Sequence, residues 1–352
     1  MKIPIENIYY LLCYSWDKLE ERDRIKVSIE DKTTLVDLFA KILINAANML
    51  IKRGIDRTYV LHFDDLQTVK GKVAVSETLK TNLLFRQRIL CAYDDLSSDI
   101  QINKILVSTL HRLLKTRTLD NKLKNEMVKL RRMLADIQPV VLRASMFNGI
   151  RYNRNNRFYE FIINVCKIVF DSTFPSERLG EYQFSDFTRD EHKMNQLFES
   201  FIRNFYKIEQ QRFRIVRKEI IKWQFDEAND TSIEFLPRME TDITLENKET
   251  KVIIDAKYYR ETMTVNFDKE RIRSANLYQL FSYLINQRDG TPKTQNASGV
   301  LLYPTVEKDY DVDFMYQGHN IQIRTVNLNT NWRNISRRLK QIVGVSEMNS
   351  YI

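Results

Sequence analysis

Apolar residues recur at helical spacing along the first 150 residues of the chain. This periodicity predicts amphipathic helices at residues 34–53, 98–115 and 121–134. Short strands are expected between the first two helices, at residues 58–63, 69–77 and 85–95. Gly71 falls within one of these runs and indicates a turn or a close backbone approach. This part of the chain is therefore predicted to be mainly helical with a small β-sheet.

A polar connector follows. Residues 146–160 are rich in Asn and contain a Gly, which is typical of a linker. The next helix, predicted at residues 158–174, is apolar nearly all round and is expected to lie in a core. A length of 352 residues favours two domains. We therefore predict a boundary near residue 150, with domains of residues 1–150 and 151–352.

The order of elements becomes specific after residue 190. An amphipathic helix at residues 190–210 places Leu197, Phe198, Phe201, Ile202 and Phe205 on one stripe. The elements that follow are three strands at residues 212–220, 238–246 and 251–259, a helix at residues 273–287, and a strand at residues 298–304 that Pro304 ends. The predicted fold class is α/β, of the α+β type, with a helix, a three-strand meander, a helix and a strand in the second domain.

The last two strands of the meander carry carboxylates that a half-buried strand does not otherwise favour. Asn247 begins a turn of residues 247–250, a position that favours Asn. A symmetric hairpin then pairs residue 246 with 251 and Asp242 with Asp255. Residues paired in this way share one face of the sheet, with β-carbons about 4.5 to 5.5 Å apart. Two carboxylates this close repel unless a cation lies between them, and oxygen ligands suit Mg²⁺.

Lys257 lies two residues after Asp255, so its side chain emerges on the same face. A lysine there can hold or deprotonate a water that attacks phosphorus, or neutralise charge in the transition state. Ala256 points away, and its carbonyl is available as a further metal ligand. The apolar run of residues 252–254 predicts a central strand that delivers these groups to the sheet edge. The alternative is a structural salt-bridge cluster of Asp242, Asp255 and Lys257.

Three further residues are candidates for the same site. Glu199, in the preceding helix, can add an outer carboxylate, although a solvated helix charge fits the same position. Gln279 and Tyr283 are four residues apart on the later helix and so share a face. They can orient the lysine or contact a phosphate, but ordinary surface residues show the same spacing.

The net charge of +9 favours a polyanionic partner. The excess is concentrated in residues 104–143, which hold 10 Lys and Arg against 3 Asp and Glu. These residues form either solvated helix faces or a surface for nucleic acid or an acidic protein. Three widely spaced cysteines indicate reduced thiols, and the apolar stretch at the amino terminus is too short to span a membrane. We expect a cytoplasmic protein without a membrane anchor.

These motifs resemble a known nuclease superfamily. Asp242, followed by Asp255-Ala256-Lys257 in this order of elements, resembles the PD-(D/E)xK motif, and Gln279-x-x-x-Tyr283 is similar to the motif of the RecB-like branch. Five segments between residues 3 and 304 resemble the McrC family, the nuclease subunits of McrBC modification-dependent restriction systems: IPIENIYYLLCYSWD, LPRMETDIT, IIDAKYY, NLYQLFSYL and GVLLYP. Thr241 replaces the proline of the superfamily motif, which changes little because that proline binds no ligand.

The resemblance implies a Mg²⁺-dependent endonuclease that cuts double-stranded DNA only with a partner, the AAA+ GTPase McrB. In that family McrB reads the methylated cytosine and hydrolyses GTP, whereas McrC docks on the McrB ring through its amino-terminal domain and stimulates the GTPase. Residues 1–150 are then the docking domain and residues 151–352 the endonuclease domain. The sequence contains no Walker-type phosphate loop, so GTP is expected on the partner and no nucleotide on this chain.

The resemblance also implies roles for individual residues. The resemblance implies that Asp242 and Asp255 bind metal, with the carbonyl of Ala256 as the further ligand expected above. It implies catalytic roles for Asp242, Asp255, Lys257, Gln279 and Tyr283, whereas Glu199 is a catalytic candidate from its position in the preceding helix and not from the resemblance. Candidate contacts with the partner are the turn of Lys70, Gly71 and Lys72 and the aromatic side chains of Tyr9, Tyr10 and Trp16, although helix packing explains those aromatics better. Cutting two strands implies at least two copies in the active assembly.

Two other functions fit the same residues. A RecB-like exonuclease or branched-DNA nuclease would act alone, so cleavage by the purified protein without a partner favours it. A non-catalytic DNA-binding or assembly module would use the Asp and Lys cluster only to hold its sheet together. The absence of metal-dependent cleavage under every partner condition favours that second alternative.

Overall fold

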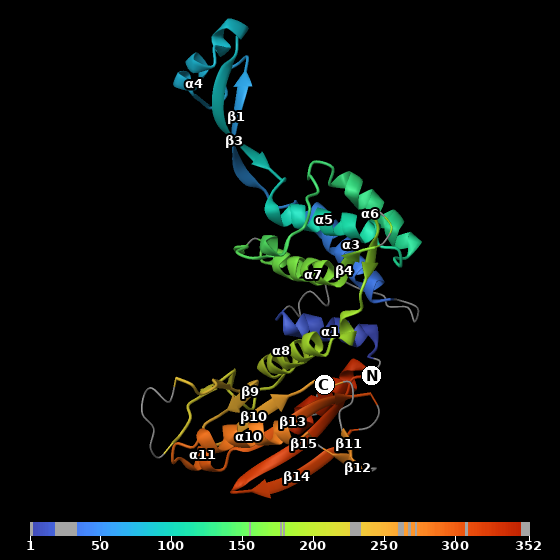
Figure 1. The fold of residues 1–352 in the computed structure, drawn as a ribbon, viewed down its shortest axis with the longest axis vertical. Coiled ribbons are helices and arrows are strands. Elements are labelled where there is room, and N and C mark those ends of the chain that lie inside the picture. The colour runs from blue at the N-terminus through green and yellow to red at the C-terminus, as the bar shows by residue number, and fades with distance from the viewer. Residues whose placement is uncertain are drawn as a thin grey trace, which may run out of the picture. The chain divides into compact units, whose positions relative to one another are not determined.

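The computed structural model describes residues 3–17, 34–225, 234–259, 264–306 and 309–345, except residues 155, 177, 179, 267, 268 and 272. It divides into two compact units (Figure 1). The sheet unit comprises Met1–Arg24 and Asp186–Ile352, and the helical unit comprises Ile25–Ser185. The division thus differs from the predicted boundary near residue 150, and the first helix belongs with the carboxyl-terminal part of the chain.

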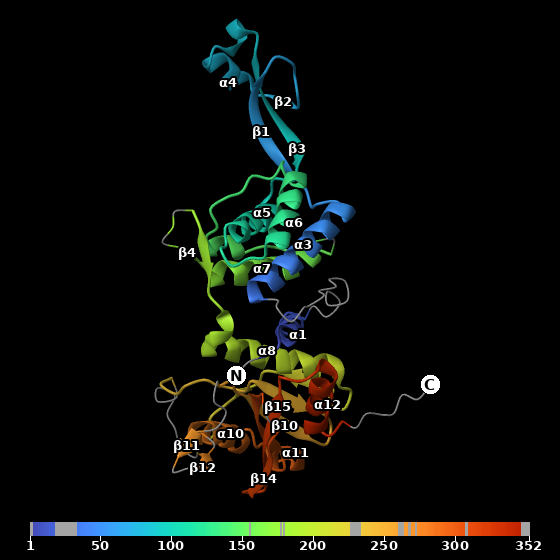
Figure 2. The same ribbon diagram turned by 90° about the vertical axis from the view of Figure 1, so that its right-hand side faces the viewer.

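The helical unit confirms the helices predicted for the first part of the chain. Its elements in order are α3 (Leu35–Arg53), β1 (Thr58–Leu66), β2 (Lys72–Val73), α4 (Val75–Lys80), the 3₁₀ helix η1 (Leu83–Arg86), β3 (Ile89–Ser97), α5 (Gln101–Leu114), α6 (Asn121–Met133), η2 (Ala144–Phe147), α7 (Phe158–Ser172), β4 (Thr173–Pro175) and β5 (Tyr182–Phe184). Helices α3, α5, α6 and α7 pack together and form its core (Figures 1 and 2).

Helix α7 is the reason that the boundary lies later than predicted. This helix packs against α3 and α5 of the helical unit. Its Tyr159 hydroxyl donates to Asn103 Oδ1 (2.8 Å) and accepts from the Asp56 amide (3.1 Å). The Asn-rich stretch before α7 is therefore a loop within this unit rather than a linker between units.

The small sheet of the helical unit is dominated by β1 and β3. These two strands pair antiparallel along their whole length, and we call the pair the β ribbon. The strand predicted at residues 69–77 is wrong for most of its length, because only Lys72–Val73 pairs with β3 and α4 follows at once. The close backbone approach predicted at Gly71 is confirmed: its φ is +69°, and a β-carbon there would lie 2.4 Å from the Ala92 carbonyl oxygen.

The sheet unit confirms the predicted order of helix, three strands, helix and strand. Its elements are α1 (Ile5–Ser15), η3 (Phe187–Arg189), α8 (Glu191–Glu209), β6 (Ile215–Arg217), β7 (Ile220–Ile221), β8 (Met239–Glu240), β9 (Ile243–Glu246), β10 (Lys251–Ala256), β11 (Thr264–Asn266), β12 (Lys269–Arg271), α10 (Ser274–Asn286), α11 (Pro292–Gln295), β13 (Ser298–Thr305), β14 (Asp311–Tyr316), β15 (His319–Asn327) and α12 (Trp332–Ile342). The fold class is thus α+β, as predicted.

A mixed sheet forms the centre of this unit. In the part of the chain that the structure describes it has six strands in the order β14-β15-β13-β10-β9-β6. β6, β9 and β10 are antiparallel neighbours, which confirms the meander, whereas β10, β13 and β15 run parallel. β13 continues one residue past Pro304, contrary to the prediction. The proline is tolerated because β10 ends opposite Leu302, so no hydrogen bond to that strand is lost.

Helices cover both faces of the sheet. On one face, α10 contributes Leu280 and Leu284 to a core with Ile253, Leu301 and Ile323 of the central strands. On the other face lie α8 and α12, joined by a hydrogen bond from the Tyr206 hydroxyl to the Leu339 carbonyl (2.9 Å). Figure 2 shows β10 and β15 between α10 and α12. Gly299 of β13 permits the close approach of α10, since a β-carbon there would lie 2.8 Å from Leu284.

The first helix, α1, packs on α8 within the sheet unit. Tyr9 is buried, and Tyr10 stacks on Trp332 of α12 with ring centroids 4.6 Å apart. The Asn7 amide donates to the Leu328 carbonyl (2.8 Å). Helix packing, the explanation that we preferred for these aromatic residues, is thus confirmed for Tyr9 and Tyr10. None of the helices in the described ranges has both the length and the apolar character of a membrane span.

Candidate active site

Three predicted residues meet at the end of β10. The Lys257 ammonium lies 3.2 Å from Asp242 Oδ2 and 3.0 Å from Asp255 Oδ1. Asp255 is fully buried, Asp242 is 8% exposed and Lys257 is half-buried, so the group opens to solvent on the side of Asp242 and Lys257. Buried charges of this kind are unfavourable unless they are paired. The structure therefore confirms that these three side chains converge.

The hairpin register that brings them together follows from the turn. Asn247 Oδ1 accepts from the Glu249 and Thr250 amides (2.9 and 2.7 Å). The ladder then pairs Lys251 with residue 246 and ends with residue 254 opposite residue 243. One step further along, Asp242 lies opposite Asp255, as predicted. The Ala256 amide donates to Asp242 Oδ2 (3.0 Å), which fixes the carboxylate against the end of the strand.

Burial and charge set the protonation of the cluster. Burial raises the pKa of Asp255, and the neighbouring Asp242 raises it further, against the opposing effect of Lys257. Burial disfavours the Lys257 ammonium, but the two carboxylates outweigh it and raise the pKa of Lys257 above its ordinary value. Lys257 is therefore a cation at neutral pH, and the cluster holds more negative than positive charge whenever both aspartates are ionised.

The residues present fit a single divalent ion. Asp255 Oδ2 is buried and has no hydrogen-bond partner among the residues that the structure describes, which is unusual for a buried carboxylate oxygen. A hard cation would satisfy it. No group of three or more His, Cys, Asp and Glu side chains suited to a metal was found in the described ranges. The protein can thus supply only part of a coordination shell here, as is usual for Mg²⁺, which keeps several waters.

Glu199 lies beside this cluster. Burial and the charge of Asp242 raise the pKa of Glu199. Its side chain is held from two directions, since Asn195 donates a hydrogen bond to its Oε1 and Lys218 lies 4.0 Å from its Oε2. Glu199 is therefore not the freely solvated helix charge of the alternative interpretation. Whether it takes part in catalysis stays a prediction.

Gln279 and Tyr283 are brought together as their spacing predicted. The Gln279 amide donates to the Tyr283 hydroxyl (2.8 Å), which in turn donates to the Glu240 carbonyl (2.9 Å). Burial, followed by the negative charge of Asp255, raises the pKa of Tyr283 to about 12. Tyr283 thus lies within electrostatic reach of the aspartates, and it ties α10 to the strand that precedes Asp242.

Comparison with known proteins identifies the family. The model of the McrBC 5-methylcytosine restriction system component matches residues 6–304. The chain belongs to this family. It is 32% identical over 340 residues to the type IV methyl-directed restriction enzyme EcoKMcrBC of Escherichia coli (strain K12), and the match covers 97% of each chain.

A solved structure has the same fold as this McrBC family chain. It is a half-complex from a tetradecameric assembly of Thermococcus gammatolerans McrB AAA+ hexamers with bound McrC. The similarity has a TM-score of 0.61 at 19% sequence identity and covers 96% of this chain and 76% of the other. At this level of identity the comparison establishes the fold alone.

One residue of the candidate site, Asn195, was not among those predicted from the sequence. Its Oδ1 accepts from the Tyr258 amide (2.8 Å), directly after Lys257, while its amide nitrogen donates to Glu199. One side chain thus joins α8 to the end of β10. Its spacing of four residues from Glu199 places both on one helix face, a signal that was present in the sequence.

A second missed group joins the residues after β10 to α10 and β13. The Tyr259 hydroxyl donates to Asn276 Oδ1 (3.2 Å), and the Asn276 amide donates to the Tyr303 hydroxyl (3.0 Å). The Arg273 guanidinium stacks over the Tyr259 ring at 4.0 Å. These residues come from three elements that are distant in sequence, so no local pattern could have connected them.

Proposed function

We propose that this chain is the DNA-cutting subunit of a GTP-dependent, 5-methylcytosine-specific restriction complex. It would act as a Mg²⁺-dependent endonuclease on double-stranded DNA, with a McrB-type AAA+ GTPase ring as its partner and at least two copies in the active assembly. The observation that carries the proposal is the convergence of Asp242, Asp255 and Lys257 at the end of a central strand. The restriction enzyme of E. coli and the McrB-bound relative support it.

Asp242, Asp255 and the Ala256 carbonyl would hold the metal ion. When bound, Mg²⁺ supplies Lewis-acid polarisation of the scissile phosphate and a more acidic water. Asp255 offers its unpartnered Oδ2, and Asp242 is aimed by the hydrogen bond from the Ala256 amide. Both carboxylates are therefore positioned before a metal arrives, which reduces the reorganisation that binding requires.

Lys257 would act as a positive charge rather than as a base. Because the two carboxylates raise its pKa, the ammonium has no lone pair with which to take a proton from water at neutral pH. We infer that it holds the attacking water and stabilises charge that develops on the phosphate oxygens. Glu199, whose pKa is raised, is better suited to accept a proton from that water.

The helical unit would dock on the GTPase through the β ribbon. Tyr59, Leu61 and Phe63 alternate along β1 and therefore lie on one face, and Leu96 of β3 is paired with Tyr59 on that face. Tyr59 is 71% and Phe63 61% exposed. Large apolar side chains that gather on an exposed surface indicate a protein contact, and aromatic residues often carry most of the binding energy.

A cleavage assay with Asp255→Asn tests the proposed function. The variant keeps the shape of the side chain but removes a metal-binding charge, so we expect cleavage of methylated DNA, with Mg²⁺, GTP and the partner, to fall at least about 1,000-fold. Stimulation of the partner's GTPase should be unchanged, which serves as the control for folding and docking. Cleavage near the wild-type rate would refute the site. Strong cleavage by the wild-type chain without the partner would favour the stand-alone nuclease.

A further inference from the structure

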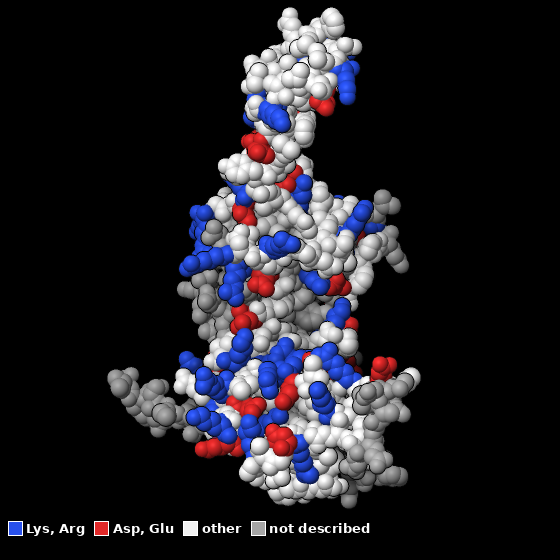
Figure 3. Space-filling model, turned by 90° about the vertical axis from the view of Figure 1, so that its left-hand side faces the viewer, with Lys and Arg blue, Asp and Glu red and all other residues white. Residues whose placement is uncertain are grey.

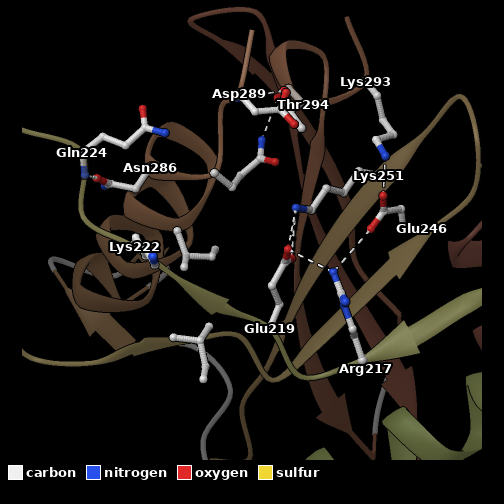
Figure 4. Close-up of a pocket in the computed structure, with 13 residues that line it drawn as sticks. Arg217, Glu219, Lys222, Gln224, Glu246, Lys251, Asn286, Asp289, Lys293 and Thr294 are labelled. Carbon is white, nitrogen blue, oxygen red and sulfur yellow. Dashed lines mark hydrogen bonds and ion pairs between the residues drawn. The ribbon is translucent and has the colours of Figure 1, made fainter. Parts of the chain in front are cut away.

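A polar pocket lies on the same face of the sheet as the candidate active site. It has a volume of about 320 Å³ and lies at the opposite end of β10, where α11 and the end of α10 meet β6, β7 and β9. Its charged lining residues are Arg217, Glu219, Lys222, Glu246, Lys251, Asp289 and Lys293. Figure 4 shows these side chains around the cavity.

The carboxylates on the inner wall of the pocket are already bound by neighbouring side chains. Lys251 is only 6% exposed, and its ammonium lies 3.0 Å from both oxygens of Glu219. Lys293 is paired with Glu246. The third acid, Asp289, accepts hydrogen bonds from the hydroxyls of two threonines of the α11 turn (2.6 Å each). Each carboxylate therefore already has a close partner.

The positive charges of Arg217 and Lys222, at the mouth of the pocket, are only weakly balanced by nearby carboxylates. Arg217 reaches Glu219 and Glu246 only at 3.4 and 3.8 Å, and its side chain is 53% exposed. Lys222 is exposed and forms no ion pair with any residue of the described ranges. Residues 212–222 hold five Lys and Arg against one Glu. Figure 3 shows one side of the sheet unit, where many Lys and Arg side chains lie interspersed with Asp and Glu.

The geometry points to a ligand that also reaches the candidate active site. Lys251 and Asp255 are four residues apart on β10 and share a face, which places them about 13 Å apart. One strand of duplex DNA carries a phosphate about every 3.4 Å along its axis. A duplex that runs along β10 with its scissile phosphate at Asp255 would therefore bring another phosphate near the pocket about four base pairs away.

We propose that Arg217 and Lys222 each bind a backbone phosphate of the DNA, in the region about four base pairs from the cut. This inference rests on the proposed function and adds to it a binding subsite. Lys251 and Lys293 line the same pocket, and their ion pairs with Glu219 and Glu246 hold its inner wall in place. Arg217 and Lys222 read no sequence, because phosphate contacts position a duplex without specifying bases.

Salt-dependent binding of the full chain to a duplex tests the subsite. In EDTA, so that no cleavage occurs, R217A/K222A should bind about tenfold more weakly than wild type near 0.1 M salt. The slope of log affinity against log salt should become shallower by about 2, or about 1 per lost contact. The matched control is R333A/R337A on α12, which removes two exposed charges from the opposite face and should change neither value.

Several outcomes would overturn the subsite. They are an unchanged slope for R217A/K222A, an equal loss in the α12 control, no binding of the wild-type chain to DNA, or binding of inorganic phosphate at the pocket with no effect on the DNA slope. The measurement needs no catalysis, so it is separate from the cleavage assay. If Asp255→Asn cuts DNA normally while R217A/K222A loses affinity, the active site is wrong; the phosphate contacts then stand, but their distance from the cut does not.

Duplexes with single methylphosphonate linkages locate the contact. A neutral linkage about four base pairs from the cut should weaken wild-type binding, because it removes a charge that Arg217 or Lys222 binds. The same linkage should have no further effect on R217A/K222A. Equal sensitivity of the variant and the wild type at that position would contradict the proposal.

Discussion

Each of the two units contains side chains in an unfavourable environment, but the sheet unit buries charged groups whereas the helical unit exposes apolar ones. The sheet unit buries charge, with Asp255 fully enclosed and paired to Lys257. The helical unit exposes apolar surface, with Tyr59 and Phe63 on the outer face of the β ribbon. Each arrangement costs free energy in the isolated chain. Each fits one part of the proposed function, since a buried carboxylate can receive a metal ion and an exposed apolar face can receive a partner.

The largest effect is expected from removing the cation of the buried cluster. Lys257→Met leaves two buried carboxylates without a counter-charge, which should destabilise the metal-free protein by about 3–5 kcal/mol at pH 8. It should also raise the pKa of Asp255 further. Because an acid with a raised folded-state pKa stays protonated only in the folded protein, stability is lost as pH rises above the unfolded value of about 3.9.

Thermal unfolding at pH 5 and pH 8 without metal measures this effect. The variant should be close to wild type at pH 5, where Asp255 is protonated, and much less stable at pH 8. Lys248→Met, in the exposed turn of the same hairpin, is the matched control and should show no such difference. If Lys257→Met loses the same amount of stability at both pH values, Lys257 stabilises the sheet by packing alone.

The next largest effect concerns the exposed apolar face. Phe63→Ser should weaken docking by at least about 2 kcal/mol, or about 30-fold, if this side chain is a binding hot spot. The measurement is the concentration of this chain that half-maximally stimulates the partner's GTPase. The unfolding temperature should not fall, since the side chain is exposed in the free chain.

Met133→Ser provides the control for the ribbon. This residue is also exposed in the helical unit but lies at the end of α6, outside the ribbon. It should leave stimulation unchanged. Equal effects of the two substitutions, or none from Phe63→Ser, would remove the ribbon from the docking surface.

A smaller effect is expected from Asn195→Ala. The substitution removes the hydrogen bonds to Glu199 and to the Tyr258 amide, so both groups should be less well positioned. Cleavage should fall about tenfold, the Mg²⁺ concentration for half-maximal cleavage should rise, and GTPase stimulation should stay the same. Gln196→Ala, at the next position and exposed, is the control. Identical Mg²⁺ dependence of the two variants would leave Asn195 with a purely structural role.

The candidate site was predictable where local rules determine it. The turn at Asn247 fixed the register, and alternation along a strand then placed Asp242, Asp255 and Lys257 on one face. Helical spacing did the same for Gln279 and Tyr283. Each step depends on contacts between residues close in sequence, so pattern and geometry were sufficient.

Tertiary contacts decided what the sequence could not predict. The Asn-rich stretch before α7 has the composition of a linker, yet α7 packs on α5, and composition does not reveal which core a helix joins. Likewise, α1 packs on α8, although the residues of the whole helical unit lie between these two helices in the sequence. The Asn276 and Tyr303 pair and the pocket at Lys251 unite distant elements for the same reason.

A crystal structure grown with Mn²⁺ in place of Mg²⁺ tests the central claim most directly, because Mn²⁺ gives an anomalous signal and favours the same oxygen ligands. The account predicts one peak between Asp242 and Asp255, about 2.1 Å from an oxygen of each, and no peak there in Asp255→Asn. A wild-type crystal with no ion at these two carboxylates, or with Lys257 still bridging them in saturating metal, would contradict it.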